Sequence, residues 1–339
     1  MEESVIKNIK PLGFQWETQD PFLFCVHHED FFPKGNDKLG PADNLDGRRI
    51  GNDFEIKDGY RMYHGSTVSG FPGHPHRGFE TITVVRKGMV DHTDSLGGSG
   101  RYGDGDVQWM TAGKGVQHAE MFPLLSKTED NPMELFQIWL NLPKASKFVE
   151  PNYKMLWSDT IPNYEHTDSN GKKTMVEVVA GTIGNKTAPS PTPNSWAADS
   201  NNEVAIWNIQ MDAKAKWVLP KANASVNRTI YFFKGDKLRV NSTMVEEYHA
   251  AEVNADTEIT LESGEERSYI LILQGKPIGE PVVQHGPFVM NTREEIQQTF
   301  TDYQETGFGG WPWPTHDPVH PREKGRFAKY DDGTEETRG

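Results

Sequence analysis

Residues 70–85 read GFPGHPHRGFETITVV and place two histidines, His74 and His76, one residue apart before an apolar run. On a β-strand, residues i and i+2 point to the same face and lie about 6–7 Å apart along the chain. Two imidazoles on one face can bind a single metal ion. This stretch therefore predicts half of a metal site on a strand.

A second stretch, DVQWMTAGKGVQHAEMFP at residues 106–123, repeats the spacing with His118 and Glu120. The residue between them, Ala119, points to the opposite face of a strand. If the two strands lie close together in one β-barrel, three imidazole nitrogens and one carboxylate converge. We therefore expect one mononuclear site held by the two pairs.

These two stretches and a third, EPVVQHGPFVMNTREEI at residues 280–296, resemble the pirin family, two-domain members of the cupin superfamily. The resemblance spans both halves of the chain in the right order. It implies an all-β fold of two cupin-type β-barrels (double-stranded β-helices) in tandem. A short C-terminal helix and an irregular tail are expected to follow.

The fourth ligand is a choice between two glutamates. In most cupins it is the Glu four residues after the second His of the H-x-H pair, which is Glu80 here. The pirin resemblance implies Glu120 instead, and we favour it because it shares a strand face with His118. Glu80 then supports a ligand, since metal-bound imidazoles usually donate their other N–H to such a group.

Short apolar or alternating runs between turn signals predict the remaining sheets. One strand with a solvent-exposed face is predicted from an alternating run, in which polar residues separate Val253, Ala255, Thr257, Ile259 and Leu261. Further strands are expected at 79–85, 107–111, 136–142, 175–180, 204–210, 229–233, 238–240 and 269–274.

One helix is expected after these strands. Thr292 is a good N-cap and Glu295 completes a capping box, so the helix should run from Arg293 to Glu305 and stop at Gly307. Three segments follow from the proline-rich boundary after Leu142. They are a metal-binding domain (1–150), a second barrel that lacks an H-x-H pair and so a metal site (151–306), and an irregular extension (307–339).

Composition excludes several classes of protein. The chain of 339 residues carries a formal charge of −14, which argues against direct binding to nucleic acid. No apolar run approaches the roughly 20 residues of a membrane helix. The single cysteine, Cys25, lies in an apolar run and is expected to be a buried thiol. With no apolar leader at the N-terminus, these features predict a cytoplasmic protein.

The resemblance implies two activities. One is quercetin 2,3-dioxygenase activity, the O2-dependent opening of a flavonol-like aromatic substrate, with Glu120 taking the hydroxyl proton. The other is a non-enzymatic metal- or redox-sensing regulator that binds a protein partner such as a transcription factor. Arg77, beside the site, is expected either to orient an oxyanion, to pair with an acid, or to be solvated.

The identity of the metal stays open, because His and carboxylate ligands suit Fe, Mn, Ni, Cu and Zn. We favour Fe(II). A purely structural ion is a further alternative, although structural zinc sites are usually closed, four-coordinate and rich in Cys.

Overall fold

The computed structural model describes residues 5–339, which form two compact units. Each unit is assembled from separate segments of the chain. The histidine unit consists of Val26–Ile138, Leu142–Ser158 and Glu280–Gly339. The apolar unit consists of the chain up to Cys25 together with Trp139–Asn141 and Asp159–Gly279.

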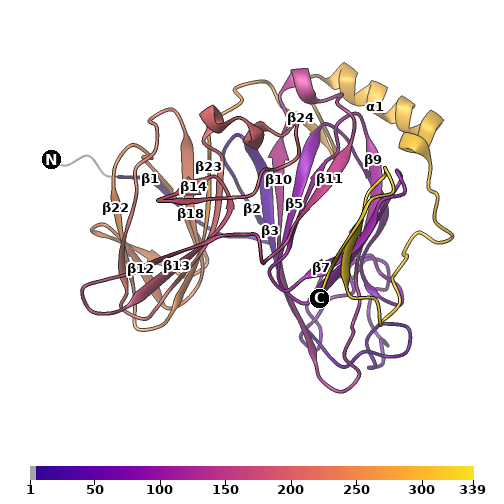
Figure 1. Ribbon diagram of the computed structural model, residues 1–339, viewed down its shortest axis with the longest axis horizontal. Coiled ribbons are helices and arrows are strands. Elements are labelled where there is room, and N and C mark those ends of the chain that lie inside the picture. The colour runs from indigo at the N-terminus through magenta and orange to yellow at the C-terminus, as the bar shows by residue number, and fades with distance from the viewer. Residues whose placement is uncertain (1–4) are drawn as a thin grey trace. The chain divides into compact units, whose positions relative to one another are not determined.

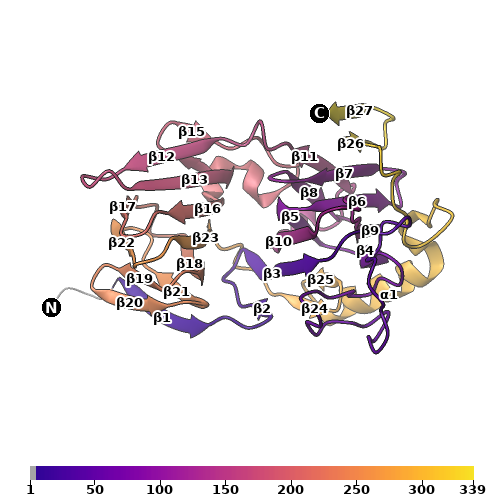
Figure 2. The same cartoon turned by 90° about the horizontal axis from the view of Figure 1, so that it is seen from below.

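Two main sheets build the histidine unit (Figure 1). One has the strand order β27-β26-β7-β6-β9-β4, which Figure 2 shows in that sequence. Its strands are β4 (Ser69–His76), β6 (Met89–Asp94), β7 (Ser99–Gly103), β9 (Val116–Phe122), β26 (Arg326–Lys329) and β27 (Glu335–Arg338). The other sheet includes the order β11-β8-β5-β10-β3. Its strands are β3 (Phe22–Phe32), β5 (Phe79–Lys87), β8 (Val107–Thr111), β10 (Asn131–Asn141) and β11 (Asn152–Leu156).

A glycine allows β4 to lie close against β9. Gly70 has φ +132°, and a Cβ atom there would lie 2.4 Å from the carbonyl oxygen of Glu120. A side chain at this position would push the two strands apart, because real Cβ atoms do not approach oxygen so closely. Gly70 therefore helps to bring the two predicted ligand pairs together.

The apolar unit also contains two main sheets, in the orders β1-β21-β18-β23-β16-β13-β12 and β17-β22-β19-β20. The first contains β1 (Ile6–Pro11), β12 (Asn163–Thr167), β13 (Lys173–Ala180), β16 (Ala205–Met211), β18 (Asn227–Lys234), β21 (His249–Val253) and β23 (Ser268–Gly275). The second contains β17 (Lys216–Leu219), β19 (Lys237–Val240), β20 (Thr243–Glu246) and β22 (Ile259–Ser263). Their inner faces meet in a core of aliphatic and aromatic side chains such as Trp207, Ile230 and Leu261.

The strands predicted from short runs agree with this pattern to within a residue or two at most ends. The alternating run from Val253 to Leu261 is the exception. The structure divides it into β21 and β22, joined by a turn over 254–258. Ala255 is buried but accepts a hydrogen bond from Ala222 through its carbonyl rather than lying in a strand. Alternation of side chains alone therefore predicted one strand wrongly, because a short turn can preserve the same inside–outside order.

The helix α1 runs from Arg293 to Thr306, one residue beyond the prediction. Thr292 and Glu295 form the predicted capping box, and Gly307 ends the helix with a left-handed conformation at φ 55°. No helix within residues 5–339 combines the length and apolar character that crossing a bilayer requires. Cys25 is buried, as predicted.

The C-terminal extension differs from the predicted irregular tail over its last part. Residues 311–325 contain no helix or strand, but β26 and β27 form a hairpin that adds to β7. The compact units also differ from the continuous segments 1–150, 151–306 and 307–339. Strand β1 pairs with β21 in the apolar unit, whereas α1 and the extension belong to the histidine unit. The three segments as functional domains stay a prediction.

Candidate metal centre

The pairing of β4 with β9 brings the two ligand pairs together. His74 lies opposite His118 and His76 opposite Val116, in antiparallel register. The register shifts between Phe71 and His74, so that the pairing is irregular next to the first histidine. Irregular pairing of this kind can redirect a side chain beside a functional site.

The three predicted histidines form one cluster. A ring nitrogen from each of His74, His76 and His118 lies within 4.8 Å of the others. Their ring centroids are 4.6 to 4.9 Å apart. Nitrogens at this separation can reach one ion at the usual distance of about 2.0–2.1 Å after small adjustments of the rings.

His118 provides a direct test of whether the cluster suits a metal. Its side chain is fully buried, yet neither ring nitrogen has a hydrogen-bond partner among residues 5–339. A buried polar group without a partner costs about 1–3 kcal/mol. A metal ion bound to one nitrogen would satisfy that atom, so the donor set fits a metal.

The protonation of the cluster also suits a ligand role. Desolvation lowers the pKa of His74 to about 4 and moves the pKa of His76 and of His118 well below its usual range. All three rings are therefore neutral at pH 7, which is the form that binds metals. The Nδ1 of His74 donates to the Pro72 carbonyl at 2.9 Å, because a carbonyl only accepts. This leaves Nε2 of His74 for an ion.

Glu120 lies next to the cluster without belonging to the three-nitrogen set. Its Oε2 is 3.8 Å from Nε2 of His118. The Thr83 hydroxyl donates to Oε1 at 2.9 Å, and the Gln137 amide donates to Oε2 at 3.4 Å. Burial raises the pKa of Glu120, and the bond from Thr83 opposes that rise. The carboxylate is thus held beside the histidines, and its role as fourth ligand stays a prediction.

Glu80 is directed to a different neighbour. Its Oε1 accepts hydrogen bonds from the Trp109 indole at 3.2 Å and from the Thr111 hydroxyl at 2.7 Å, both on β8. Glu80 is fully buried. These bonds link β5 to β8 and give the carboxylate a structural role in that sheet. They favour Glu120 over Glu80 as the ligand without deciding between them.

The sequence analysis did not single out His92, a fourth histidine whose ring lies beside that of His118. His92 and Asp94 on β6 have the same i, i+2 spacing as the two predicted pairs. The His92 ring lies 5.6 Å from that of His118, and its Nε2 is 3.0 Å from Oδ2 of Asp94. The register pairs His92 with Glu120 and Asp94 with His118. The H-x-D spacing, eighteen residues after the first histidine, was the signal that could have found it.

Arg77, next to His76, points away from the cluster. Its guanidinium makes a 2.7 Å salt bridge to Asp302 on α1 and donates to the Lys114 carbonyl at 2.6 Å. Arg77 is 6% exposed, so it is not a solvated surface residue. Of the three predicted roles, the structure shows the pairing with an acid.

Gln117, next to His118, also contacts the segment that contains α1. Its side-chain amide donates to the Gly307 carbonyl at 2.6 Å, and the Tyr303 hydroxyl donates to its Oε1 at 3.1 Å. Neighbouring residues on a strand point to opposite faces. The segment from α1 to Gly310 therefore contacts β9 on the face opposite His118, and it contacts Arg77 directly after the end of β4.

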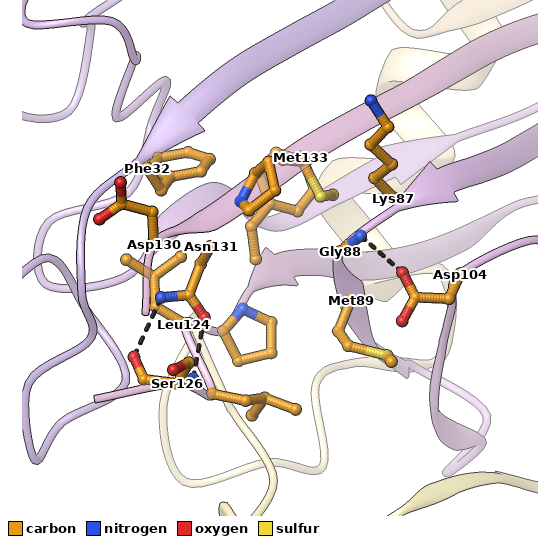
Figure 3. Close-up of a pocket in the computed structure, with 14 residues that line it drawn as sticks. Phe32, Lys87, Gly88, Met89, Asp104, Leu124, Ser126, Asp130, Asn131 and Met133 are labelled. Carbon is orange, nitrogen blue, oxygen red and sulfur yellow. Dashed lines mark hydrogen bonds between the residues drawn. The ribbon is translucent and has the colours of Figure 1, made fainter. Parts of the chain in front are cut away.

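A separate pocket of about 350 Å³ lies beyond the C-terminal end of β9, next to the ends of β3 and β5 (Figure 3). Phe122, two residues after Glu120, lines it together with Phe32 and Met133. The hydrogen bonds that Figure 3 marks join residues of the pocket wall to one another; for example, the Gly88 amide donates to the Asp104 carboxylate. The pocket is thus mainly apolar and offers few groups that would fix the orientation of a ligand.

The family models and the similar proteins point to the same family. The model for Pirin matches residues 15–140, and the model for the Pirin C-terminal cupin domain matches residues 206–309. Human Pirin is 33% identical over 252 residues, covering 73% of this chain and 80% of the relative. A Pseudomonas aeruginosa protein named "Putative quercetin 2,3-dioxygenase" is 35% identical over 238 residues, covering 69% of this chain and 78% of the relative.

Among solved structures, a quercetin 2,3-dioxygenase from Acinetobacter baumannii superposes with a TM-score of 0.70 at 25% identity. The superposition covers 90% of this chain and 98% of that one. Together with the match to the C-terminal cupin domain, it confirms the predicted all-β cupin fold.

Proposed function

Because this chain belongs to the pirin family, we propose that it is a metal-dependent cupin dioxygenase that opens a flavonol-like compound with O2. The observation that carries the proposal is the convergence of His74, His76 and His118, with Glu120 beside them. The names of the Pseudomonas and Acinetobacter relatives support the reaction class.

The proposed ligands are His74, His76, His118 and Glu120. These side chains would hold the ion, and the ion would supply Lewis-acid and redox chemistry to a bound substrate. We favour Fe(II), with Mn, Ni, Cu and Zn as alternatives. When bound, such an ion lowers the pKa of a substrate hydroxyl and assists electron transfer to O2.

Glu120 is proposed to accept the hydroxyl proton of the substrate as well as to bind the ion. Thr83 and Gln137 hold its two oxygens, so the carboxylate is oriented before the substrate arrives. A proton acceptor must lie within hydrogen-bond reach of the proton that it takes. The position of Glu120 beside His118 satisfies that condition for a hydroxyl at the cluster.

Phe71 is the best candidate among the aromatic residues for contact with the substrate. It is half-buried, and its ring lies 6.4 Å from that of His74. Phe79 and Trp109, which lie near the motifs in sequence, are fully buried core residues. A planar flavonol would therefore approach along Phe71 on the side of His74, the least buried of the three histidines.

Oxygen uptake with quercetin tests the proposal. The purified protein, loaded separately with Fe(II), Mn, Ni, Cu and Zn, should consume O2 with at least one metal. His74→Ala should abolish both metal binding and uptake. If metal binding depends on His74 but the protein consumes no O2 with any of these metals, the proposed dioxygenase activity towards quercetin is rejected.

A second candidate is a regulator in which the metal site controls a protein-binding surface. The contacts of Arg77 and Gln117 with the α1 segment favour it, because each is adjacent to a proposed ligand. Small movements of β4 or β9 would thus be transmitted to the helix. Pull-downs with reduced and oxidised protein should then recover different partners, and identical recovery would count against this candidate.

A further inference from the structure

Residues 311–339 of the C-terminal extension lie beyond both regions matched by the family models and belong to the histidine unit. The Trp313 indole donates to the carbonyl of Asp94 at 2.8 Å. Buried Arg101 donates to the carbonyls of His320 and Lys324 at 2.9 and 2.7 Å. With β26 paired to β7, these contacts fix the extension along β6 and β7, in the same sheet as β4 and β9.

The first part of the extension rests on Gly73, the residue before His74. The Trp311 and His316 rings are stacked, with centroids 5.8 Å apart and an angle of 11° between planes. The Trp311 indole also donates to the Thr315 carbonyl at 2.7 Å, which closes the segment into a compact turn. A Cβ atom at Gly73 would lie 3.1 Å from Nδ1 of His316 and 3.3 Å from the Trp311 ring. The turn therefore fits against a glycine with almost no spare room.

One peptide group connects this turn to the first proposed ligand. The Gly73 N–H donates to the His316 carbonyl at 2.6 Å. The Pro72 carbonyl, at the other end of the same peptide group, accepts the Nδ1 proton of His74 at 2.9 Å. Hydrogen bonds in such a chain polarise one another. The extension thus contacts the group that sets the tautomer and direction of the His74 ring.

His74 needs this support more than the other two histidines. His76 and His118 are 3% and 0% exposed, so packing restrains their rings, whereas His74 is only half-buried. The pairing of β4 with β9 is also irregular just before His74. Because its side chain is less enclosed than those of the other two histidines, the hydrogen bond to the Pro72 carbonyl contributes to fixing the orientation of the His74 ring.

We propose that residues 311–316 are a positioning element for His74, acting through the Pro72–Gly73 peptide group. The proposal rests on the proposed metal site and deepens it. It assigns part of the affinity for metal to a segment that the family models do not include. The residues do not touch the ion themselves, so their role is to orient a ligand.

Binding of Co(II) to the full-length protein tests this inference without any activity measurement. Affinity is measured by competition with a chelator, and the visible absorption spectrum of bound Co(II) reports the ligand geometry. Trp311→Ala should weaken binding by about tenfold and alter the spectrum, since partners of metal ligands typically contribute 10–100-fold. Trp311→Phe keeps a ring to stack on His316 and should restore most of the affinity.

Gly73→Ala gives a second route to the same contact. Its methyl group would force the His316 and Trp311 side chains to shift by a few tenths of an ångström. Co(II) affinity should therefore fall although the extension keeps every residue. In a Trp311→Ala background the same change should have a smaller effect, because one of the two obstructing side chains is gone. If Trp311→Ala does not fold, Gly73→Ala decides the question.

Two control variants separate positioning from general damage. Trp196→Ala removes a tryptophan of the apolar unit whose indole also donates to a carbonyl, at 2.9 Å, and should leave Co(II) binding unchanged. Arg326→Ala breaks the salt bridge to Asp106 and loosens the extension at β26. It should leave the Co(II) spectrum unchanged.

The outcomes distinguish this inference from the proposed function. If His74→Ala still binds Co(II) like the unmodified protein, the metal site itself is wrong. If His74→Ala loses Co(II) but Trp311→Ala and Gly73→Ala keep the original affinity and spectrum, the site stands and the positioning role is overturned.

Discussion

Both units have an apolar core, and the histidine unit also carries a cluster of imidazoles in its interior. In the apolar unit, strands β16, β18 and β23 direct residues such as Trp207, Ile230 and Ile272 into a continuous apolar core. In the histidine unit, β4 and β9 direct His76 and His118 inward. Within residues 5–339, only the histidine unit holds a cluster of three or more metal-binding side chains.

The difference shows where stability and chemistry reside in this chain. Apolar burial contributes roughly 25 cal/mol per Å² without any need for partners. A buried imidazole contributes little until a proton donor, acceptor or metal satisfies it. We therefore expect loss of apolar volume to destabilise either unit, whereas loss of metal ligands and of buried charge should affect the histidine unit.

The largest expected effect comes from making the interior of the histidine unit resemble that of the apolar unit. His118→Leu should weaken metal binding by more than about 100-fold, because even groups that only support a ligand contribute 10–100-fold. Without metal, the same change should raise the free energy of unfolding by about 1–3 kcal/mol, since it removes buried ring nitrogens that make no hydrogen bond to residues 5–339. Metal content and denaturant unfolding measure the two effects.

His249→Leu is the matched control, because His249 lies on β21 of the apolar unit and outside the cluster. It should not change metal content. Retention of metal by His118→Leu would remove His118 from the proposed ligands.

The reciprocal change reduces volume in the apolar unit. Leu261→Ala should lower the free energy of unfolding by about 2–5 kcal/mol, because Leu261 is fully buried in the core. Affinity for metal should remain as before. Denaturant unfolding and Co(II) titration of the same preparation check both statements, and a parallel loss of metal would show that the units are not energetically separate.

Acid should destabilise the histidine unit through a buried ion pair. Burial alone would raise the pKa of Glu134, but His27 and Arg86 outweigh it and lower the pKa to about 2 from an ordinary 4.5. Because the folded-state pKa is depressed, this stabilisation is complete above pH 4.5 and is lost as pH falls towards 2. The loss should reach up to about 3 kcal/mol.

Glu134→Gln should flatten this part of the pH profile. Chemical denaturation of both proteins between pH 5 and 2 provides the comparison. Equal slopes for the two would mean that Glu134 does not titrate in this way.

The smallest expected effect separates the two candidate glutamates. Glu120→Gln should weaken metal binding by about 10–100-fold. Glu80→Gln should leave metal binding intact and cost about 1–3 kcal/mol of stability, because Trp109 and Thr111 would lose a charged acceptor. Metal titration of both variants is the measurement, and a stronger loss in Glu80→Gln would reverse the ligand choice.

The sequence by itself determined the features that depend on neighbours along the chain. The i, i+2 spacing put His74 with His76 and His118 with Glu120, because side chains alternate on any strand. The capping box of α1 likewise depends only on Thr292 and Glu295, three residues apart. The H-x-D pair of His92 and Asp94 followed the same rule and was open to the same reasoning.

Only the tertiary structure decided which distant segments meet. The turn that divides the run from Val253 to Leu261, the pairing of β26 with β7, and the salt bridge from Arg77 to Asp302 all depend on long-range packing. The same is true of the hydrogen bond from Gly73 to His316, whose partners are more than two hundred residues apart. Local spacing carries no information about such contacts, because they form only when the whole chain buries its apolar faces and satisfies its polar groups.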